Sequence, residues 1–360
     1  MGERTLMKGN EALGEAAVRA GCRFYFGYPI TPQNELTAYM AKRMDEVGGV
    51  FLQSESEVAA INMIYGASAA GVRAMTSSSG PGISLMQEGI SYLAGAELPC
   101  VIVNVMRGGP GLGNIAPSQG DYFQATRGGG HGDYRTIVLA PYRVQEMADL
   151  TTLAFYLADK YRTPVVVLVD AVLGQMMEPV EFGELDLPPL PPKDWTVGYM
   201  MGRPKRLVTS LHLAPGALER HNLHLKEKYE RIESEEVRWE GVCLEDAEVV
   251  LVAYGTSARV CLGAVRKGRR EGRKVGLFRP ITLWPFPWKA LREVAERVKA
   301  ILVVEMSLGQ LVEDVRLAVE GRCPVHLLGR PGGGVPTVRE VSERVGETLD
   351  GGGDEVVESL

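Results

Sequence analysis

Short apolar runs alternate with helix-like segments along the first half of the chain. The apolar runs are rich in residues that favour strands, and they lie at residues 22–29, 50–54, 72–78, 99–106, 135–141 and 164–174. Between most of them, apolar residues recur at the three- and four-residue spacing of a helix face, in residues 10–21, 36–48, 57–71, 83–97 and 144–161. This alternation predicts a parallel sheet covered by helices on both faces. We therefore expect a doubly wound α/β domain over residues 1–182.

The pattern changes between residues 183 and 245. The proline-rich stretch LPPLPP cannot continue a helix or a strand, and the charge-dense segment HNLHLKEKYERIESEEVRWEG follows it. We predict a linker with an excursion and one exposed helix. A second alternating region, with about four strands, predicts a smaller α/β domain over residues 246–346, and residues 347–360 are expected to form a flexible tail.

Composition narrows the class of protein. The chain has 360 residues, of which 45% are hydrophobic and 23% charged, as in ordinary globular proteins. Its formal net charge of -6 argues against a nucleic-acid partner, and the basic stretch KGRREGRK is expected to be a solvated helix end. No apolar run has the length of a membrane span, and no signal peptide is evident. We therefore expect no membrane partner and a cytoplasmic location.

Cysteine and histidine spacing argues against a metal centre held by this chain. The 5 cysteines form no CxxC pair, so a disulfide framework, a structural metal site and an iron–sulfur cluster are not expected. His221 and His224 are three residues apart, but their segment is the predicted exposed helix.

Polar and glycine-rich loops follow the first four predicted strands. In open α/β sheets ligands bind beyond the carboxyl ends of the strands. The loops are YPITP (28–32), SESE (54–57), SSSGPG (77–82) and RGGPGLGN (107–114). We expect all four to share one edge of the sheet. SSSGPG is expected to let backbone approach a ligand, but neither a P-loop nor a dinucleotide-binding spacing is present.

Two of these loops offer groups that suit an anionic ligand. Thr31 lies between two prolines, which make its segment rigid; the alternative is that Thr31 only caps the next helix. Arg107 stands at a strand end before several glycines, and its guanidinium suits a carboxylate or a phosphate. The alternative is a surface arginine beside a flexible loop. His131 closes the same loop and is more often a structural histidine.

Glu55 and Glu57 lie where a strand gives way to a helix. Glu57 is expected in the first helical turn, where the helix dipole stabilises an acid. That explanation suffices for Glu55. For Glu57, the apolar run from Val58 to Ile61 predicts partial burial, and a buried carboxyl is suited to sharing a proton with a ring nitrogen.

Several longer stretches form one combination: YPITP, QSESEVAAINMIYGASAAG, TSSSGPG and VNVMRGGPG. Together they resemble the α subunit of thiamine-diphosphate-dependent 2-oxoacid:ferredoxin oxidoreductases. GLGN, SQGDYFQATRGGGHGDYR and VVEMSLGQLVEDVR are most similar to the subunit of the 2-oxoisovalerate enzyme, and the resemblance covers essentially the whole chain. It implies a pyrimidine-binding domain followed by a smaller domain like the transketolase C-terminal domain.

The resemblance also implies roles for particular residues. Glu57 would hydrogen-bond the ring nitrogen of the cofactor's aminopyrimidine, so that thiazolium C2 loses its proton and attacks the 2-oxoacid, which releases carbon dioxide. Pro29 and Ile30 would pack near the pyrimidine, and Thr31 and Arg107 would hold the substrate's carboxylate and carbonyl.

The chain lacks the GDG motif that precedes a distal Asn in diphosphate and Mg²⁺ sites. The resemblance implies that a β subunit supplies that site and that iron–sulfur clusters lie on other chains, with γ and ferredoxin-like δ subunits completing the complex. Electrons would pass to ferredoxin and the acyl group to coenzyme A. This polypeptide would then hold half an active site and no metal of its own.

Two other functions stay open at this point. One is a non-catalytic scaffold subunit, against which Thr31, Glu57 and Arg107 together argue. The other is a subunit of a non-oxidative thiamine-dependent decarboxylase, because the electron path would lie in other chains. The substrate is open too: Arg127 and His131 are candidates for the second carboxylate of 2-oxoglutarate, whereas the resemblance favours a branched or small aliphatic oxoacid.

Overall fold

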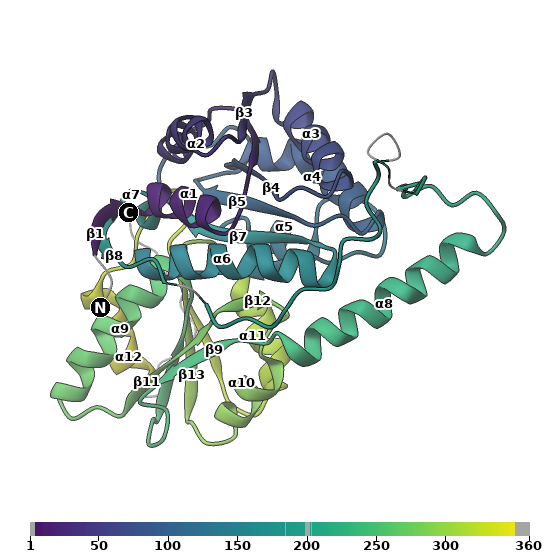
Figure 1. Cartoon of the computed structure of the whole chain (residues 1–360). Coiled ribbons are helices and arrows are strands. Elements are labelled where there is room, and N and C mark those ends of the chain that lie inside the picture. Colours follow the sequence, from purple (N-terminus) through teal and green to yellow (C-terminus); the bar gives the residue numbers. More distant parts are fainter. Residues whose placement is uncertain (1–3, 184, 199–201, 203, 350–360) are drawn as a thin grey trace.

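The computed structural model describes residues 4–183, 185–198, 202 and 204–349. Two open sheets dominate it (Figure 1). We call the part built on the larger sheet the first domain and the part built on the smaller sheet the second domain. The predicted fold class, a doubly wound parallel α/β domain followed by a smaller α/β domain, is confirmed. The predicted boundaries at residues 182, 245 and 346 stay predictions, and most of the predicted tail lies outside the described residues.

The first domain contains a 7-stranded sheet in the order β12-β6-β7-β5-β4-β2-β3. Its parallel strands are β2 (Phe24–Gly27), β3 (Val50–Gln53), β4 (Ala74–Ser78), β5 (Cys100–Met106), β6 (Ile137–Leu139) and β7 (Pro164–Asp170). Every residue of β5 and β7 is buried, which explains why these central strands are almost continuously apolar. The strands expected from the apolar runs are all present.

Helices cover this sheet on both faces. They are α1 (Gly9–Arg19), α2 (Asn34–Glu46), α3 (Glu57–Ala69), α4 (Pro81–Gly95), α5 (Tyr122–Arg127), α6 (Val144–Tyr161) and α7 (Ala171–Gln175). α1 packs against α2 and α6, while α3 packs against α4. The short helices α5 and α7 were not expected from the sequence, because they span too few residues to show a helical period.

The second domain contains a 5-stranded sheet in the order β14-β13-β10-β11-β9. Its strands are β9 (Trp239–Val242), β10 (Val249–Val252), β11 (Val275–Pro280), β13 (Ala300–Glu305) and β14 (Val325–Gly329), and its helices are α9 (Gly255–Arg270), α10 (Trp288–Ala295), α11 (Leu311–Val319) and α12 (Val338–Leu349). The expectation of four strands missed β9, which pairs antiparallel with β11. β9 is an edge strand without an apolar run, so the sequence offered no signal for it.

Two further pairings join distant parts of the chain. β12 (Thr282–Trp284) follows β11 in sequence but pairs antiparallel with β6, at the edge of the first domain's sheet. β1 (Thr5–Lys8) pairs antiparallel with β8 (Met177–Val180). Both pairings tie together segments far apart along the chain, and neither was expected.

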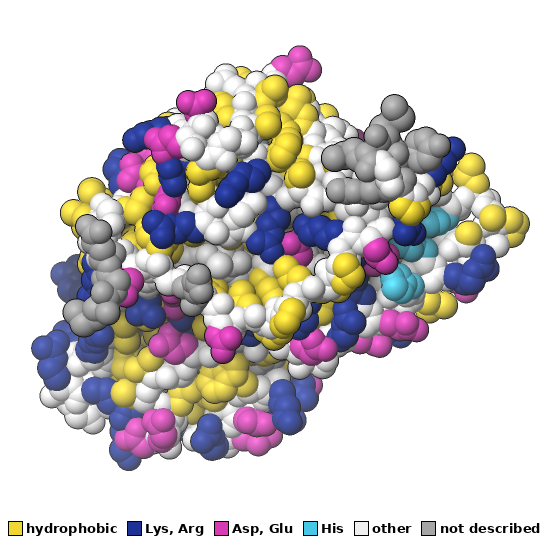
Figure 2. Space-filling model, viewed as in Figure 1, with side chains coloured by type: hydrophobic (Ala, Val, Ile, Leu, Met, Phe, Trp, Pro, Cys, Tyr) yellow, Lys and Arg dark blue, Asp and Glu magenta, His cyan; other side chains and the backbone are white. Residues whose placement is uncertain are grey.

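The excursion carries the expected exposed helix, α8 (Ala217–Glu235), which extends along one side of the molecule (Figure 1). Lys228 of α8 forms an ion pair with Glu97 at 3.1 Å. Burial lowers the pKa of Lys228, and Glu97 opposes this effect. Histidine side chains gather near α8 (Figure 2). His221 contacts the carbonyl of Gly95, and His224 contacts the Glu97 carboxylate.

The described part of the chain holds no group of three or more His, Cys, Asp or Glu residues arranged for a metal ion. None of its helices is both long and apolar enough to cross a membrane. The basic stretch at the end of α9 is a solvated helix end, where Lys267 pairs with Glu271 and Arg269 with Asp246.

Candidate active site

Four strand-end loops of the first domain meet at one edge of the sheet, as predicted. Ser78, at the end of β4, donates a hydrogen bond from Oγ to Oε1 of Glu57, which follows β3, at 3.5 Å. Gly80 packs against the side chain of Arg107, which follows β5. The Nη1 atom of Arg107 donates to the carbonyl of Thr31, which follows β2, at 3.0 Å. Thr31, Glu57 and Arg107 are therefore linked through one continuous set of contacts.

Glu57 is the first residue of α3, and its neighbour Ser56 is the N-cap. The Ser56 hydroxyl accepts a hydrogen bond from the backbone N–H of Ala59 at 3.2 Å, which fixes the helix start. Glu57 is only 5% exposed, whereas Glu55 is exposed. The bend between β3 and α3 thus separates the side chains of Glu55 and Glu57. It buries Glu57, the residue that the sequence predicts to be functional.

The surroundings of the Glu57 carboxylate differ from the expected apolar wall. Val58 is 44% exposed and points away from the core. The carboxylate instead lies against Ser78 and Gly82: a Cβ atom built on Gly82 would lie 2.4 Å from Glu57 Oε1 and 2.1 Å from Ser78 Oγ. Only glycine at position 82 leaves this space. We call Ser78, Gly82 and the Glu57 carboxylate the Glu57 cradle.

Substitution of Gly82 tests the Glu57 cradle. In Gly82→Ala the new methyl group must displace the Glu57 carboxylate or the Ser78 hydroxyl, because real Cβ contacts below 3.0 Å are essentially not observed. We expect turnover of the assembled enzyme to fall at least tenfold, since a displacement of ~1 Å at a catalytic group can cost about 10²-fold. Steady-state kinetics measures the effect, and circular dichroism checks the fold. Gly66→Ala on α3 is the matched control, because a Cβ there meets no atom of the described residues within 4 Å.

Buried hydroxyl groups hold the YPITP loop in place. The Tyr25 hydroxyl lies 2.6 Å from Ser77 Oγ and 3.0 Å from Thr37 Oγ1, and both Ser77 and Thr37 donate to Gln33 Oε1. The Gln33 amide in turn donates to the carbonyl of Tyr28 at 3.2 Å. Burial raises the pKa of Tyr25, so its hydroxyl stays protonated. The loop therefore rests on β2, β4 and the start of α2.

Thr31, Ile30 and Pro29 all lie at or near the surface of this loop, Pro29 exposed and the other two half-buried. The N-cap of α2 is Gln33, so the alternative that Thr31 caps the helix is wrong. The Thr31 hydroxyl accepts from the Asn34 side chain at 3.3 Å.

Arg107 is buried, with 8% of its surface exposed, so the alternative of a surface arginine is wrong. Nη1 is bound by the Thr31 carbonyl and Nη2 by the Leu112 carbonyl, at 3.0 and 3.2 Å. The Nε atom is buried and has no hydrogen-bond partner within the described residues. A buried N–H without an acceptor is costly, so this donor calls for a partner that the described residues do not supply.

Arg127 and His131 do not join this group. Arg127 binds Asp314 of α11 in the second domain at 2.8 Å and lies over the Phe123 ring. His131 is exposed, and its carbonyl accepts a hydrogen bond from Ser91. The Arg127 guanidinium is therefore already bound by Asp314, whereas only the backbone of His131 is engaged.

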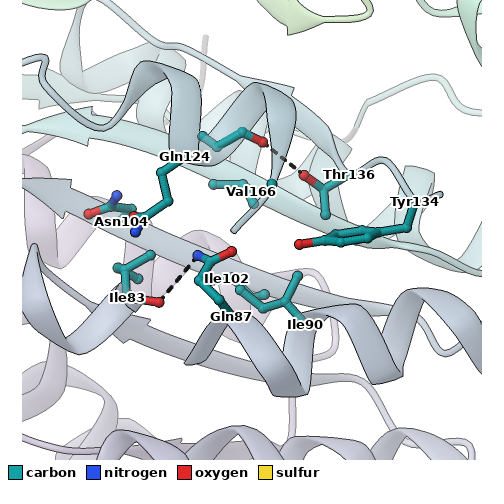
Figure 3. Close-up of a pocket in the computed structure, with 11 residues that line it drawn as sticks. Ile83, Gln87, Ile90, Ile102, Asn104, Gln124, Tyr134, Thr136 and Val166 are labelled. Atoms are coloured by element: carbon teal, nitrogen blue, oxygen red, sulfur yellow. Dashed lines mark hydrogen bonds between the residues drawn. The ribbon is translucent and has the colours of Figure 1, made fainter. Parts of the chain in front are cut away.

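A small cavity lies inside the first domain between α4, α5 and β5 (Figure 3). Its volume is about 20 Å³, enough for about one water molecule. Asn104 and Gln124 line it, and the amide oxygens Asn104 Oδ1 and Gln124 Oε1 have no hydrogen-bond partner among the residues that the structure describes. We expect a buried water here; the cavity is too small for an oxoacid.

Two protein-family models match this chain, and together they cover most of both domains. The model of the family described as "Pyruvate flavodoxin/ferredoxin oxidoreductase, thiamine diP-bdg" matches residues 15–233. A second model, "Pyruvate:ferredoxin oxidoreductase core domain II", matches residues 247–341. The chain belongs to this oxidoreductase family. The edge that carries Glu57 and Arg107 lies within the part matched as thiamine-diphosphate-binding.

Individual relatives place the chain more narrowly within the family. It is 55% identical over 349 residues to ketoisovalerate oxidoreductase subunit VorB of Methanothermobacter thermautotrophicus, covering 97% of this chain and 99% of that one. It is 41% identical over 319 residues to 2-oxoglutarate synthase subunit KorA of Archaeoglobus fulgidus, covering 87% and 91%. The chain is thus a subunit of a 2-oxoacid:ferredoxin oxidoreductase, an enzyme class whose members act with partner subunits.

Two solved structures have a fold similar to that of this chain. The 2-oxoglutarate:ferredoxin oxidoreductase of Magnetococcus marinus matches with a TM-score of 0.87 at 28% identity, covering 97% of this chain and 66% of that one. This chain therefore spans about two thirds of that chain's length. A split-gene transketolase, described as an inactive β4 tetramer, matches with a TM-score of 0.59 at 16% identity, which supports the fold alone.

The residues present fit the pyrimidine half of thiamine diphosphate. A buried carboxylate in the Glu57 cradle suits a ring nitrogen, and the rigid YPITP loop follows the adjacent strand. The sequence placed the SSSGPG loop at this edge but gave no individual role to Ser78 or Gly82. A serine at the end of a buried strand, directly before a Gly-Pro-Gly helix start, was the available signal.

Proposed function

We propose that this chain binds the aminopyrimidine of thiamine diphosphate through Glu57 and the carboxylate of a 2-oxoacid through Arg107. The observation that carries the proposal is that one loop contacts both groups. Its Ser78 and Gly82 lie against Glu57, and Gly80, between them, packs against Arg107. A scaffold subunit has no use for a buried acid and a free buried guanidinium N–H at one sheet edge.

Each residue of the site has a distinct role. Thiamine diphosphate, when bound, supplies the nucleophilic carbon that adds to the oxoacid carbonyl. Glu57 exchanges a proton with the pyrimidine ring nitrogen, and its burial keeps water from competing for that proton. Ser78 holds the Glu57 carboxylate from the side, and Pro29 and Ile30 provide the apolar contact to the ring.

Arg107 and Thr31 hold the substrate. Two carbonyls already bind the Nη atoms of Arg107, and the free Nε–H donates to the oxoacid carboxylate. A charge-assisted hydrogen bond of this kind is stronger than a neutral one. The Thr31 hydroxyl donates to the oxoacid on a support that the two flanking prolines and Gln33 keep rigid.

The remaining parts of the active site belong to partner chains. We propose that a β subunit supplies the diphosphate and Mg²⁺ site, that γ and δ subunits carry the iron–sulfur clusters, and that the complex transfers electrons to ferredoxin and the acyl group to coenzyme A in the cytoplasm. The missing GDG motif and the dispersed cysteines support this division.

For the substrate we propose a branched-chain oxoacid such as 2-oxoisovalerate. The ketoisovalerate relative is 55% identical, against 41% for a 2-oxoglutarate relative. In addition, Asp314 neutralises Arg127, which removes a cation that a second carboxylate would need.

Reduction of ferredoxin by the assembled complex, measured with coenzyme A across 2-oxoisovalerate, pyruvate and 2-oxoglutarate, tests this proposal. We expect the highest kcat/KM with 2-oxoisovalerate. Release of aldehyde without ferredoxin reduction would indicate a non-oxidative decarboxylase. Full activity of a complex whose Glu57, Thr31 and Arg107 are all replaced by alanine would indicate a scaffold.

The isolated chain is expected to bind thiamine diphosphate weakly or not at all, because it lacks the diphosphate and Mg²⁺ motif. Titration calorimetry on the isolated subunit in the presence of Mg²⁺ measures this, with the assembled complex as the positive control. Micromolar affinity for the isolated chain would contradict the division of the site between subunits.

A further inference from the structure

The loop that follows Arg107 is fastened to the second domain at its tip. We call residues 108–119 the Arg107 loop. Asn114 Nδ2 donates a hydrogen bond to the carbonyl of Gly332, between β14 and α12, at 2.9 Å. Next to it, Gly333 lies so close to Ala116 that a Cβ atom on Gly333 would come within 2.6 Å of the Ala116 Cβ.

The base of the Arg107 loop is fastened as well. Gln119 is fully buried, and its backbone N–H donates to the carbonyl of Met306 at 2.8 Å. Its side-chain amide donates to the Tyr254 carbonyl and accepts from Ser257 Oγ and the Met306 N–H, each at 2.9 Å. All of these partners belong to the second domain.

Within the loop, hydrogen bonds transmit the position of the tip to Arg107. The N–H of Asn114 donates to the carbonyl of Gly108 at 2.9 Å, and the loop turns so tightly that a Cβ on Gly113 would lie 1.7 Å from that carbonyl. The carbonyl of Leu112, at the tip, accepts from Arg107 Nη2. A shift of the tip therefore shifts one of the two acceptors that hold the guanidinium.

We propose that the second domain positions Arg107 for the oxoacid carboxylate through this loop, with Asn114 as a positioning residue. The guanidinium is planar, so two fixed acceptors on its Nη atoms also set the direction of its Nε–H. The first domain supplies one acceptor, the Thr31 carbonyl. The second domain holds the other, the Leu112 carbonyl. This inference rests on the proposed role of Arg107 in substrate binding.

Asn114→Ala in the assembled complex removes the contact to Gly332 without adding a charge, and it also removes the hydrogen bond that Asn114 Oδ1 accepts from the Ala116 N–H. We expect KM for 2-oxoisovalerate to rise about two- to tenfold, the cost of one hydrogen bond, while kcat and the affinity for thiamine diphosphate stay unchanged. Amide hydrogen exchange in residues 108–116 should become faster. A loss of stability alone would not separate KM from kcat in this way.

Gly333→Ala approaches the same contact from the second domain. Its methyl group would meet Ala116, and its φ of +105° disfavours any side chain, so the tip must move. We expect the same rise in KM as for Asn114→Ala. Arg127→Gln is the matched control, because it breaks the ion pair with Asp314 between the two domains without touching the Arg107 loop. We expect it to lower stability and leave KM unchanged.

A double-mutant cycle decides whether the effect passes through Arg107. In an Arg107→Ala background, Asn114→Ala should raise KM no further. If the two substitutions instead raise KM independently, so that their effects multiply, the inference is wrong. It is also wrong if Asn114→Ala alone leaves KM unchanged, or if Arg127→Gln raises KM equally. If Arg107→Ala itself leaves KM unchanged, the proposed substrate role fails and this inference falls with it. Amide hydrogen exchange in residues 108–116 distinguishes the two failures. Faster exchange in Asn114→Ala shows that the second domain does hold the Arg107 loop, even if Arg107 does not bind the substrate.

Discussion

Glu57→Gln should lower turnover of the assembled complex by roughly 10²–10⁴-fold, the usual contribution of a general acid or base. Glutamine matches glutamate in size, and Ser78 can still donate to its amide oxygen, so the Glu57 cradle should remain filled. The amide cannot exchange a proton with the ring nitrogen. This expected loss of turnover is far larger than a lost charge at a helix N-terminus can explain, because that charge contributes only ~0.3–1 kcal/mol.

Glu55→Gln is the matched control for this prediction. Glu55 is exposed on the bend that precedes α3. Its replacement removes a carboxylate of equal charge two residues away and should leave turnover within about twofold, as for most surface substitutions. Steady-state ferredoxin reduction measures both variants. A large loss in Glu55→Gln together with a normal rate in Glu57→Gln would reverse the assignment.

Arg107→Ala should raise KM for the 2-oxoacid about ten- to a hundredfold, because one charge-assisted contact is worth ~1.5–3 kcal/mol. Thiamine diphosphate affinity should not change, since Arg107 is placed on the substrate. Arg107→Lys should recover only part of the loss, because an ammonium group cannot bind the Thr31 and Leu112 carbonyls in the geometry of a guanidinium and still offer a third fixed donor.

The measurement is initial-rate kinetics at varied oxoacid, combined with calorimetric titration of the cofactor into the complex. Arg135→Ala serves as a control, because this arginine lines a groove between residues 132–135 and α8, outside the site. An unchanged KM in Arg107→Ala would show that its buried Nε–H serves another purpose.

The sequence predicted the central parts of the fold because they carry a local signal. β5 and β7 are continuous apolar runs since both of their faces are covered. The start of α3 could be placed near Glu57 because a run of small apolar residues follows it directly. The expected burial of Glu57 is observed, but the carboxylate lies against Ser78 and Gly82, and Val58 of the expected apolar run is exposed.

The elements that the sequence missed depend on pairing between distant segments. β9 and β12 are short strands whose partners lie elsewhere in the chain, and β1 is stabilised by β8 more than 160 residues later. Short edge strands of mixed polarity show no period that distinguishes them from loops.

The same limitation applies to the site. The contact of Gly82 with Glu57, the network around Gln33 and the attachment of the Arg107 loop to Gly332 all join residues from different loops. The residue types hinted at function, but only the folded chain shows that Val58 points outward and that Arg127 is already paired with Asp314.

The central claim is that Glu57 activates the pyrimidine of thiamine diphosphate. Exchange of the cofactor's thiazolium C2 proton with solvent, followed by NMR in the assembled complex, tests it most directly, because this step needs no oxoacid, ferredoxin or coenzyme A. We predict slow exchange in Glu57→Gln and exchange at the wild-type rate in Glu55→Gln. Exchange at the wild-type rate in Glu57→Gln would contradict the account.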